Sequence, residues 1–133
     1  MNEISIAQQY MDAWNAHNPK AVAALFTKDA IFIDPSHNGL ASDVVFDLAQ
    51  SSIVGFPDVS FDVVSILRAG DGIVVLEWVM RGTNTGSVPG LPPPTGRTIA
   101  LPGVDIFQFQ TGKISSLKSY FDENTFAKQL GLA

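Results

Sequence analysis

The sequence contains no cysteine. This absence excludes disulfide bonds, thiolate nucleophiles and metal sites built from thiolates. Histidine is also scarce, because His17 and His37 are the only two and both stand in expected turns without the spacing of metal ligands. Ser36 and His37 are adjacent, but neighbours in a turn do not form a catalytic triad. We therefore expect no metal ion in this protein.

Basic residues are few. The chain has 8 Lys and Arg against 13 Asp and Glu, which gives a net charge of −5 and a pI of about 4.7. No run of Lys or Arg interrupts this acidic balance. A phosphate backbone or an anionic membrane surface would be repelled on average, so we expect no nucleic-acid partner.

Long hydrophobic runs are also missing. No stretch approaches the ~18 consecutive apolar residues of a membrane-spanning helix. The opening "MNEISIAQQYMDAWN" has an early acidic residue and no apolar run, which is not typical of a signal peptide. The sequence therefore predicts no membrane association and a cytoplasmic location.

Apolar residues are plentiful instead. The 133 residues are 46% hydrophobic and only 16% charged, and the length fits a single domain over residues 1–133. This composition is ample for a packed core and poor in surface charge, so it favours a large cavity wall, a buried oligomer interface or both. Because a sheet rich in Val, Ile and Phe can bury one face against a second subunit, we expect a homodimer.

Four helices are predicted from hydrophobic spacing and capping residues. Ile6, Tyr10 and Trp14 fall four residues apart in the first helix. The other helices have start or stop signals, namely Asn18 with Pro19, Ser42, and Asp122 with Gly131. The expected helices cover residues 5–16, 18–26, 42–52 and 122–130.

The remaining segments predict strands. "AGDG" and "TGK" are hairpin turns between strands, whereas "PSHNG" is expected to be a turn after the first strand. The expected strands cover residues 30–34, 59–68, 72–85, 98–110 and 114–121. The order of elements predicts an α+β fold in which a curved antiparallel sheet wraps around the N-terminal helices to form a cone.

One aspartate lies within an apolar strand. In "PGVDIFQF", residues 102–109, a period of two places Asp105 on the same face as Phe107 and Phe109. An ionised carboxylate there is costly unless it is paired or hydrogen-bonded, and its pKa should be raised. Asp105 is therefore either a general acid or base, a neutral donor to an oxyanion, or a buried Asp satisfied by backbone amides.

Two further residues could join Asp105. Asp34 shares a strand face with Phe32, although an Asp before a proline commonly opens a turn. Tyr10 lies on the apolar stripe of the first helix, where tyrosine is usually part of the core. If the sheet curls around the helices, all three side chains point into the cone.

The N-terminal quarter resembles a known family. "QQYMDAWNAHNPKAVAALFTKDAIFIDPSHNG" is similar to the opening of bacterial ketosteroid isomerases. Tyr10 and Asp34 are separated as that family's tyrosine and general-base aspartate are. Asp105 matches the family's second aspartate in a "P-x-D-x-F-x-F" run, with one extra residue after the proline. The resemblance implies that Asp34 is the base and that Tyr10 and a neutral Asp105 hold the oxyanion.

The C-terminal half resembles a second family. "GTNTGSVPGLPPPTGRTIALPGVDIFQFQTGKISSLKSYFDENTFAKQLGL" is similar to the SnoaL-like polyketide (ester) cyclases. In that group the residue matching Asp105 is the proposed acid/base of an intramolecular aldol closure. Asn84 stands where many relatives have a histidine, so a role that needs a titrating group is lost there. Both families belong to the nuclear transport factor two-like superfamily, whose fold is the predicted cone.

The two resemblances imply one kind of chemistry. Both families remove a proton next to a carbonyl and stabilise the enolate without a metal or an organic cofactor. We expect a small apolar carbonyl-containing substrate, a cyclase-type or isomerase-type reaction, or in the alternative a non-catalytic module that only binds such a ligand. The expected catalytic residues are Asp105, Asp34 and Tyr10. The expected substrate-binding residues are Asn84, Trp78, Trp14, Phe107 and Arg97.

The segment 86–96, "GSVPGLPPPTG", has four prolines and three glycines. It is either a lid over the mouth of the cone or an ordinary ordered surface or dimer-contact loop. Arg97 directly follows it, and its guanidinium either meets a substrate carboxylate or enolate or forms a surface ion pair, for example with Glu77.

Overall fold

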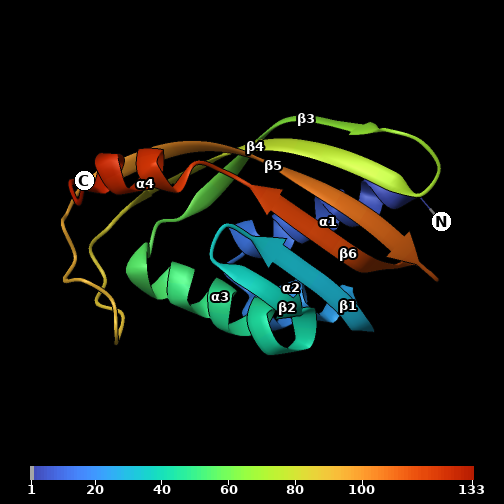
Figure 1. Cartoon of the computed structure of the whole chain (residues 1–133), viewed down its shortest axis with the longest axis horizontal. Helices are drawn as coiled ribbons and strands as arrows, with labels where there is room; N and C mark the ends of the chain where they lie inside the picture. Colours follow the sequence, from blue (N-terminus) through green and yellow to red (C-terminus); the bar gives the residue numbers. More distant parts are fainter. Residues whose placement is uncertain (1) are drawn as a thin grey trace.

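A six-stranded sheet curves around the first helix in the computed structural model, which describes residues 2–133 (Figure 1). The spatial order of the strands is β2-β1-β6-β5-β4-β3. This architecture confirms the predicted α+β cone. The strands are β1 (Phe26–Asp34), β2 (His37–Leu40), β3 (Ser60–Arg68), β4 (Ile73–Thr83), β5 (Thr98–Gln110) and β6 (Lys113–Tyr120).

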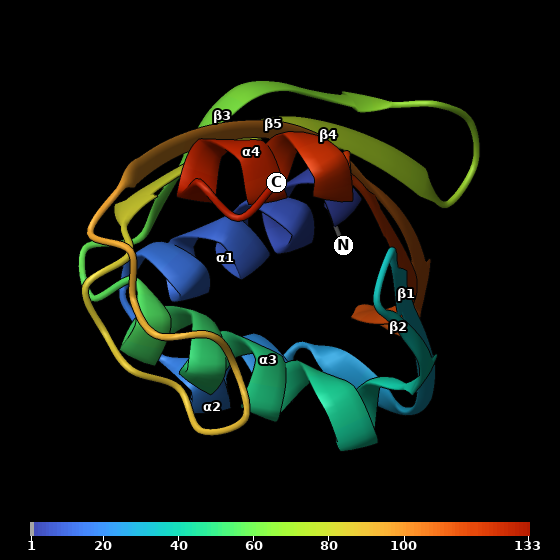
Figure 2. The ribbon, with the colours of Figure 1, turned by 60° about the vertical axis from the view of Figure 1, so that its left-hand side comes forward.

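The helices cover the concave side of the sheet. Figure 2 shows α1 inside the curve, α2 and α3 across its open side, and α4 at one end. Their bounds are α1 (Glu3–Asn15), α2 (Pro19–Ala24), α3 (Ala41–Gly55) and α4 (Glu123–Leu130). Within residues 2–133, none of these helices is long and apolar enough to cross a membrane.

Most of the predicted helix signals act as expected. The Asn18 side chain accepts a hydrogen bond from the Ala21 N–H at 3.1 Å, and the Asp122 carboxylate accepts one from the Asn124 N–H at 2.9 Å. Gly131 ends α4 in the left-handed conformation, with φ of 77°. These three residues therefore define the starts of α2 and α4 and the end of α4.

The prediction for α3 was wrong at both ends. Leu40, not Ser42, occupies the N-cap position, and its side chain makes no capping hydrogen bond. The helix also continues to Gly55, three residues beyond the expected end. It stops at Phe56 because Pro57 disfavours the helical conformation of the residue before it.

The region around Asp34 contains more sheet than expected. β1 begins at Phe26 rather than at residue 30, and the supposed turn after it contains the short strand β2. β2 pairs antiparallel with β1, with Asp34 opposite His37. The neighbouring strands of the predicted antiparallel sheet pair antiparallel, except that β1 pairs parallel with β6. The parallel pair arises because the meander β3–β6 returns to β1 with β6 running in the same direction.

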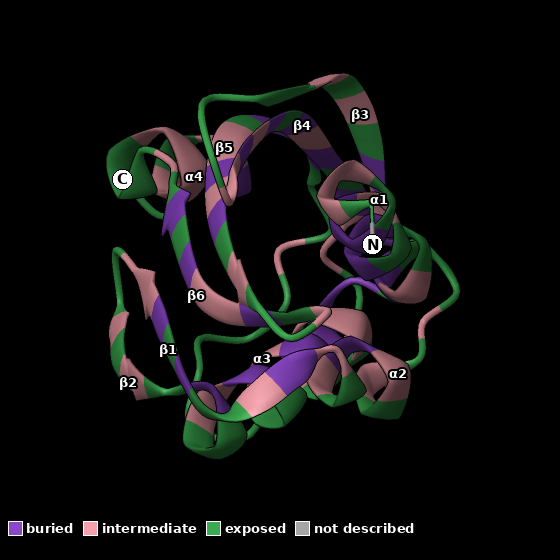
Figure 3. Cartoon of the chain, turned by 90° about the vertical axis from the view of Figure 1, so that its right-hand side faces the viewer, coloured by how far each residue is buried: buried purple, intermediate pink, exposed green. Residues whose placement is uncertain are grey.

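Burial alternates along the central strands, as the period of two predicts. Buried residues alternate with less buried ones along β4 (Figure 3). In β5, Asp105 and Phe107 are buried, whereas Val104 and Ile106 on the opposite face are only partly buried. The aspartate therefore does lie on the inner, apolar face of the sheet.

Aromatic rings pack edge to face between α1 and the sheet. Tyr10 meets Phe107 with ring centroids 5.5 Å apart, and Trp14 meets Phe61 at 5.2 Å. Phe61 in turn meets Trp78 at 5.3 Å. Such pairs add roughly 0.5–1.5 kcal/mol each beyond their buried area, so they fix where the sheet side chains point.

Gly103 permits the position of Trp78. The two residues are opposite each other in the β4–β5 pair, and the indole ring lies across the Gly103 backbone. A Cβ at residue 103 would overlap three ring carbons of Trp78. Glycine is therefore required for this close approach.

We expect Gly103→Ala to lower the free energy of unfolding by about 1–3 kcal/mol, because the indole ring must move out of a packed site. Urea unfolding followed by circular dichroism measures this change. The control is Gly39→Ala, whose new Cβ would lie 3.9 Å from Val44 in ordinary contact. Equal effects of the two substitutions would contradict the packing constraint.

Candidate functional site

A cavity of about 720 Å³ lies inside the curve of the sheet. Its wall draws on α1, α3, α4, the inner face of the sheet and the proline-rich segment 86–96. Most of the lining is apolar, so the few polar groups in it are the places where a bound molecule could be oriented. The aromatic residues of the lining are Tyr10, Trp14, Phe32, Phe56, Phe61, Trp78, Phe121 and Phe126.

Asp105 is the most buried acidic group in this lining. β5 turns its side chain inward, and the residue is only 3% exposed. Its Oδ1 has no hydrogen-bond partner among residues 2–133. Burial raises the pKa of Asp105 to about 6, and the Asp34 carboxylate adds to the rise, whereas the nearby Ser119 hydroxyl and Trp78 indole favour the charged form and limit it.

Ser119 connects the two aspartates across the sheet. It is buried, lines the cavity and lies opposite Asp105 in the β5–β6 pair. On its other side, Ile33 pairs with Lys118, which places Asp34 beside Ser119 on the same face. With neighbouring strands about 4.8 Å apart, the backbones at Asp34 and Asp105 are on the order of 10 Å apart.

Trp78 contributes the second unpartnered polar atom. Its indole Nε1 is buried in the cavity wall, close enough to Asp105 to favour the charged carboxylate, but it makes no hydrogen bond of good geometry within residues 2–133. A buried donor without an acceptor costs roughly 1–3 kcal/mol. Trp78 Nε1 and Asp105 Oδ1 are the two such side-chain atoms within the described chain. A ligand that accepts from one and donates to the other would recover this cost.

Tyr10 supplies a neutral hydroxyl at the same place. The residue is 2% exposed, and its ring packs against Phe107 and Phe26. Burial raises the pKa of Tyr10 far above its ordinary value, and the charges of Asp105 and Asp34 raise it further. Tyr10 is therefore an O–H donor at any physiological pH.

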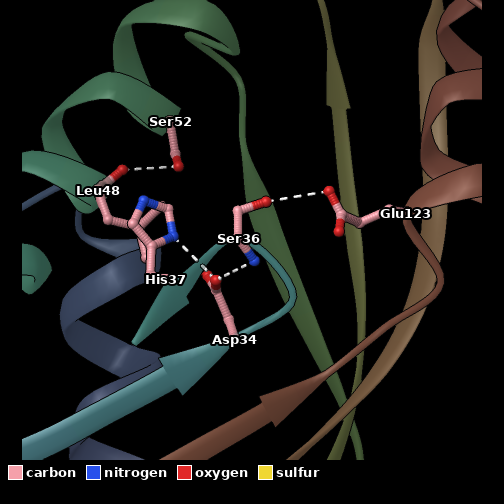
Figure 4. Close-up of polar contacts among 6 residues, drawn as sticks. All are labelled: Asp34, Ser36, His37, Leu48, Ser52 and Glu123. Carbon is pink, nitrogen blue, oxygen red and sulfur yellow. Dashed lines mark hydrogen bonds and ion pairs between the residues drawn. The ribbon is translucent and has the colours of Figure 1, made fainter. Parts of the chain in front are cut away.

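Asp34 is held at the end of β1 by its own hairpin. Its Oδ1 accepts a hydrogen bond from the Ser36 N–H at 2.8 Å and lies 2.8 Å from His37 Nδ1 (Figure 4). The Asp34 side chain is 5% exposed, whereas the His37 side chain is 39% exposed. The Asp-Pro turn expected from the sequence is therefore present, and the carboxylate lines the cavity as well.

Asn84 lines the cavity, but both ends of its amide are occupied. Its Nδ2 donates to the Gly55 carbonyl at 3.2 Å, and its Oδ1 accepts from the Thr95 N–H at 2.8 Å. Gly86 also donates its N–H to the Gly55 carbonyl at 3.2 Å. These bonds fasten segment 86–96 to the end of α3, so that the segment forms one wall of the cavity.

The other expected binding residues fall into two groups. Trp14 and Trp78 line the cavity. Phe107 and Arg97 are not among its lining residues. Phe107 is fully buried behind Tyr10, which it supports. Arg97 lies against Gly131 at the end of α4, because a Cβ built on Gly131 would be 2.7 Å from the Arg97 Nε.

Sequence reasoning missed several polar and aromatic groups of the cavity. Ser119 has a signal, since it follows Leu117 by two residues on an otherwise apolar strand face. His37 has a weaker one, namely its place opposite Asp34 across the two residues "PS". Phe56 and Phe126 have none, because only the chain's return in α4 brings their rings together, 6.1 Å apart.

The cavity offers no recognisable metal centre. Across residues 2–133, no group of three or more His, Asp or Glu side chains could hold a metal ion. Its polar groups are instead hydroxyls, an indole N–H, an amide, an imidazole and carboxylates, which can donate or accept hydrogen bonds or transfer protons.

Comparison with known protein families shows the family to which this chain belongs. The sequence model of the SnoaL-like domain matches residues 7–117. The chain belongs to the SnoaL-like domain family. This match confirms the resemblance of the C-terminal half to the SnoaL-like cyclases, and it extends the resemblance over most of the sequence. A search of curated proteins finds no match.

Solved structures of other bacterial proteins share the fold. AclR from Streptomyces galilaeus, a candidate hydroxylase, is 22% identical, with a TM-score of 0.83 over 97% of this chain and 84% of its own. IdmH from Streptomyces antibioticus, a candidate polyketide cyclase, is 23% identical, with a TM-score of 0.80 over 98% of this chain and 99% of its own.

A third solved structure has a ketosteroid isomerase-like fold, which corresponds to the resemblance of the N-terminal quarter. A protein from Catenulispora acidiphila with a ketosteroid isomerase-like fold, in complex with trimethylamine, is 22% identical, with a TM-score of 0.77 over 96% of this chain and 93% of its own. At these identities the three likenesses establish the fold alone.

The raised pKa of Asp105 predicts how stability depends on pH. The folded protein keeps the proton between pH 3.8 and about 6 whereas the unfolded chain has lost it, so stability falls as pH rises through this window. By proton linkage the loss amounts to about 3 kcal/mol. Urea unfolding of the wild type and of Asp105→Asn from pH 4 to 8 measures it, because the variant lacks this contribution. Parallel curves for the two proteins would contradict the raised pKa.

Proposed function

We propose that this SnoaL-like protein removes a proton next to the carbonyl of a small apolar molecule and stabilises the enolate that forms, in a reaction of the polyketide cyclase type. The observation that carries the proposal is the pair of unpartnered buried atoms, Asp105 Oδ1 and Trp78 Nε1, in one apolar cavity. An enol or enolate fits this pair because its oxygen accepts hydrogen bonds while its carbon exchanges a proton with a carboxyl group.

Asp105 is the acid and base of this reaction. General acid–base catalysis is most effective when the pKa of the group is near the working pH, and the pKa of Asp105 is about 6. Near neutral pH its carboxylate accepts the proton from the α-carbon. The resulting carboxylic acid can return the proton to a carbon or oxygen in a later step, so one group serves both directions.

The enolate oxygen is stabilised by neutral donors. The Tyr10 hydroxyl and the Trp78 indole N–H both lie in the cavity lining, and neither loses its proton at physiological pH. In a cavity with little water each such donor is worth ~10²–10³ in rate. Trp14 and the other aromatic side chains exclude water from this end of the cavity and leave room for a ring-sized substrate.

The isomerase-type assignment is the second candidate. It makes Asp34 the base and needs Asp105 protonated at neutral pH. A pKa of about 6 instead leaves Asp105 mostly ionised at pH 7. Asp34 Oδ1 is also already engaged by Ser36 and His37. Both observations favour the cyclase-type assignment, in which Asp105 is the base.

The test is the exchange of α-protons for deuterium in a tetralone, followed by proton NMR. We expect the wild type to accelerate exchange, with a rate that rises through pH 6 as Asp105 ionises. Asp105→Asn should slow exchange at least ~10²-fold, because the base is lost. Tyr10→Phe should slow it ~10²–10³-fold, because one donor is lost.

Asp62→Asn is the matched control, since Asp62 is exposed and pairs with Arg81 outside the cavity. It should exchange at the wild-type rate. If the wild type binds the tetralone but does not accelerate exchange, or if Asp105→Asn is fully active, the protein is a binding module or uses another base.

We also infer that the protein forms a homodimer through apolar side chains of the sheet. Val64 and Leu67 on β3 are 56% and 50% exposed, which is unfavourable for an isolated chain. Sedimentation velocity should therefore give a dimer at micromolar concentration, and Val64→Glu combined with Leu67→Glu should give a monomer. A wild-type monomer would contradict this inference.

A further inference from the structure

We propose that His37 is a second acid–base group of the cavity, which acts through its Nε2 atom while Asp34 orients it through Nδ1. This inference rests on the proposed function and deepens it. It assigns to His37 the proton transfer to the oxygen of a second reacting group. Asp105 alone does not make this transfer. The substrate class is then a molecule with an acidic C–H beside one carbonyl and a second carbonyl farther along.

The β1–β2 hairpin builds the pair. Asp34 and His37 face each other across the two-residue turn Pro35–Ser36. His37 Nδ1 is 2.8 Å from Asp34 Oδ1, and the Ser36 N–H binds the same oxygen at 2.8 Å (Figure 4). A carboxylate that is fixed by a backbone amide and is 5% exposed holds the imidazole in one orientation.

This contact leaves Nε2 available. A carboxylate accepts hydrogen bonds, so the proton of a neutral imidazole must be on Nδ1, and the Nε2 lone pair is free. Within residues 2–133, His37 Nε2 makes no hydrogen bond. His17 is the contrast, because its Nε2 lies 2.7 Å from the Val59 carbonyl oxygen and is therefore already used.

His37 also has access to a ligand. It lines the cavity, and its ring lies between α3 and the Asp34 carboxylate (Figure 4). Figure 4 also shows two polar contacts near the ring. The Ser52 hydroxyl donates to the Leu48 carbonyl at 2.7 Å, and the Ser36 hydroxyl donates to the Glu123 carboxylate at 3.0 Å.

The two acid–base groups are at different places along the same cavity. β2 is three strands from β5 in the order β2-β1-β6-β5. A substrate that extends along the inner face of the sheet would place one carbonyl at Asp105 and a second at His37. The geometry therefore points to an extended or ring-forming dicarbonyl compound rather than to a simple ketone.

The step balances without any other reactant. The Asp105 carboxylate takes the α-proton, and the enolate carbon attacks the second carbonyl carbon. A C–C bond forms while the π bond of that carbonyl breaks, and its oxygen becomes an alkoxide. Protonated His37 gives its Nε2 proton to the alkoxide. The proton on Asp105 then passes through solvent to the neutral imidazole, which restores both groups.

The first experiment determines the protonated nitrogen of each histidine. Long-range proton–nitrogen correlation spectra are recorded at an alkaline pH at which imidazole is neutral. We expect opposite tautomers, with the proton on Nδ1 in His37 and on Nε2 in His17, and His37→Asn assigns the signals. A proton on Nε2 of neutral His37 would overturn the proposal, because Asp34 would then not orient the ring through an Nδ1 proton and Nε2 could not regain the proton that it donates.

The second experiment separates a catalytic role of His37 from a merely structural one. The substrate is a fluorogenic β-hydroxy ketone, whose retro-aldol cleavage to a methoxynaphthaldehyde is the reverse of the proposed closure. His37→Asn keeps an N–H near the position of Nδ1 for Asp34 but lacks Nε2. His37→Gln places an amide near the position of Nε2 that cannot titrate.

We expect both variants to lower kcat at least about tenfold, with a smaller change in KM. The reason is that general acid–base catalysis contributes ~10²–10⁴ to the rate. Thermal unfolding of both variants checks that they remain folded. Wild-type kcat in His37→Asn would overturn the proposal and would leave His37 as a group that only holds Asp34.

The α-proton exchange assay keeps this outcome distinct from a failure of the proposed function. If the wild type does not exchange α-protons, the enolate chemistry of Asp105 is wrong, and the inference that depends on it falls as well. If the wild type does exchange them but His37→Asn cleaves the β-hydroxy ketone at the wild-type kcat, only the inference on His37 falls.

Discussion

The carboxyl group of Asp105 in an apolar cavity is the constraint on which the site depends. Burial without a partner for Oδ1 disfavours its charge and raises its pKa to about 6. A protein selected only for stability would fill this space or pair the group. Here the curved sheet and α1 instead keep a cavity open in front of it, so the unfavourable burial is maintained by the rest of the fold.

The surrounding packing explains how the cavity stays open. Edge-to-face contacts hold Tyr10 and Trp14 of α1 against the sheet, and Gly103 lets the Trp78 ring lie flat across β5. Asn84 ties segment 86–96 to the end of α3. The Asn84 side chain thus has a structural role in the cavity wall. Rigid walls on these sides preserve the orientation of the polar groups.

Local sequence patterns predicted much of the fold and of the site. They did not predict the contacts between residues that are far apart in the sequence. The period of two placed Asp105 on the inner face, and the four-residue spacing placed Tyr10 inside the cone, because both depend only on neighbours in sequence. The parallel pairing of β1 with β6 joins segments about 85 residues apart. Local patterns therefore could place Ser119 on the inner face of its strand but could not place it between the two aspartates. The sequence pattern indicates only an isolated turn residue at His37, because its pairing with Asp34 exists only once β2 forms.

The two acid–base groups are also linked through their charges. The Asp34 carboxylate raises the pKa of Asp105 by repelling a second negative charge. A proton on His37, at 2.8 Å from Asp34, offsets that charge and so makes it easier for Asp105 to ionise. When His37 is protonated, an ionised Asp105 is therefore favoured, and this is the pair that the proposed closure needs at its start. Proton transfer from the carbon to Asp105 and from His37 to the oxygen consumes both charges together, so the electrostatics of the cavity favour the two transfers occurring in one turnover.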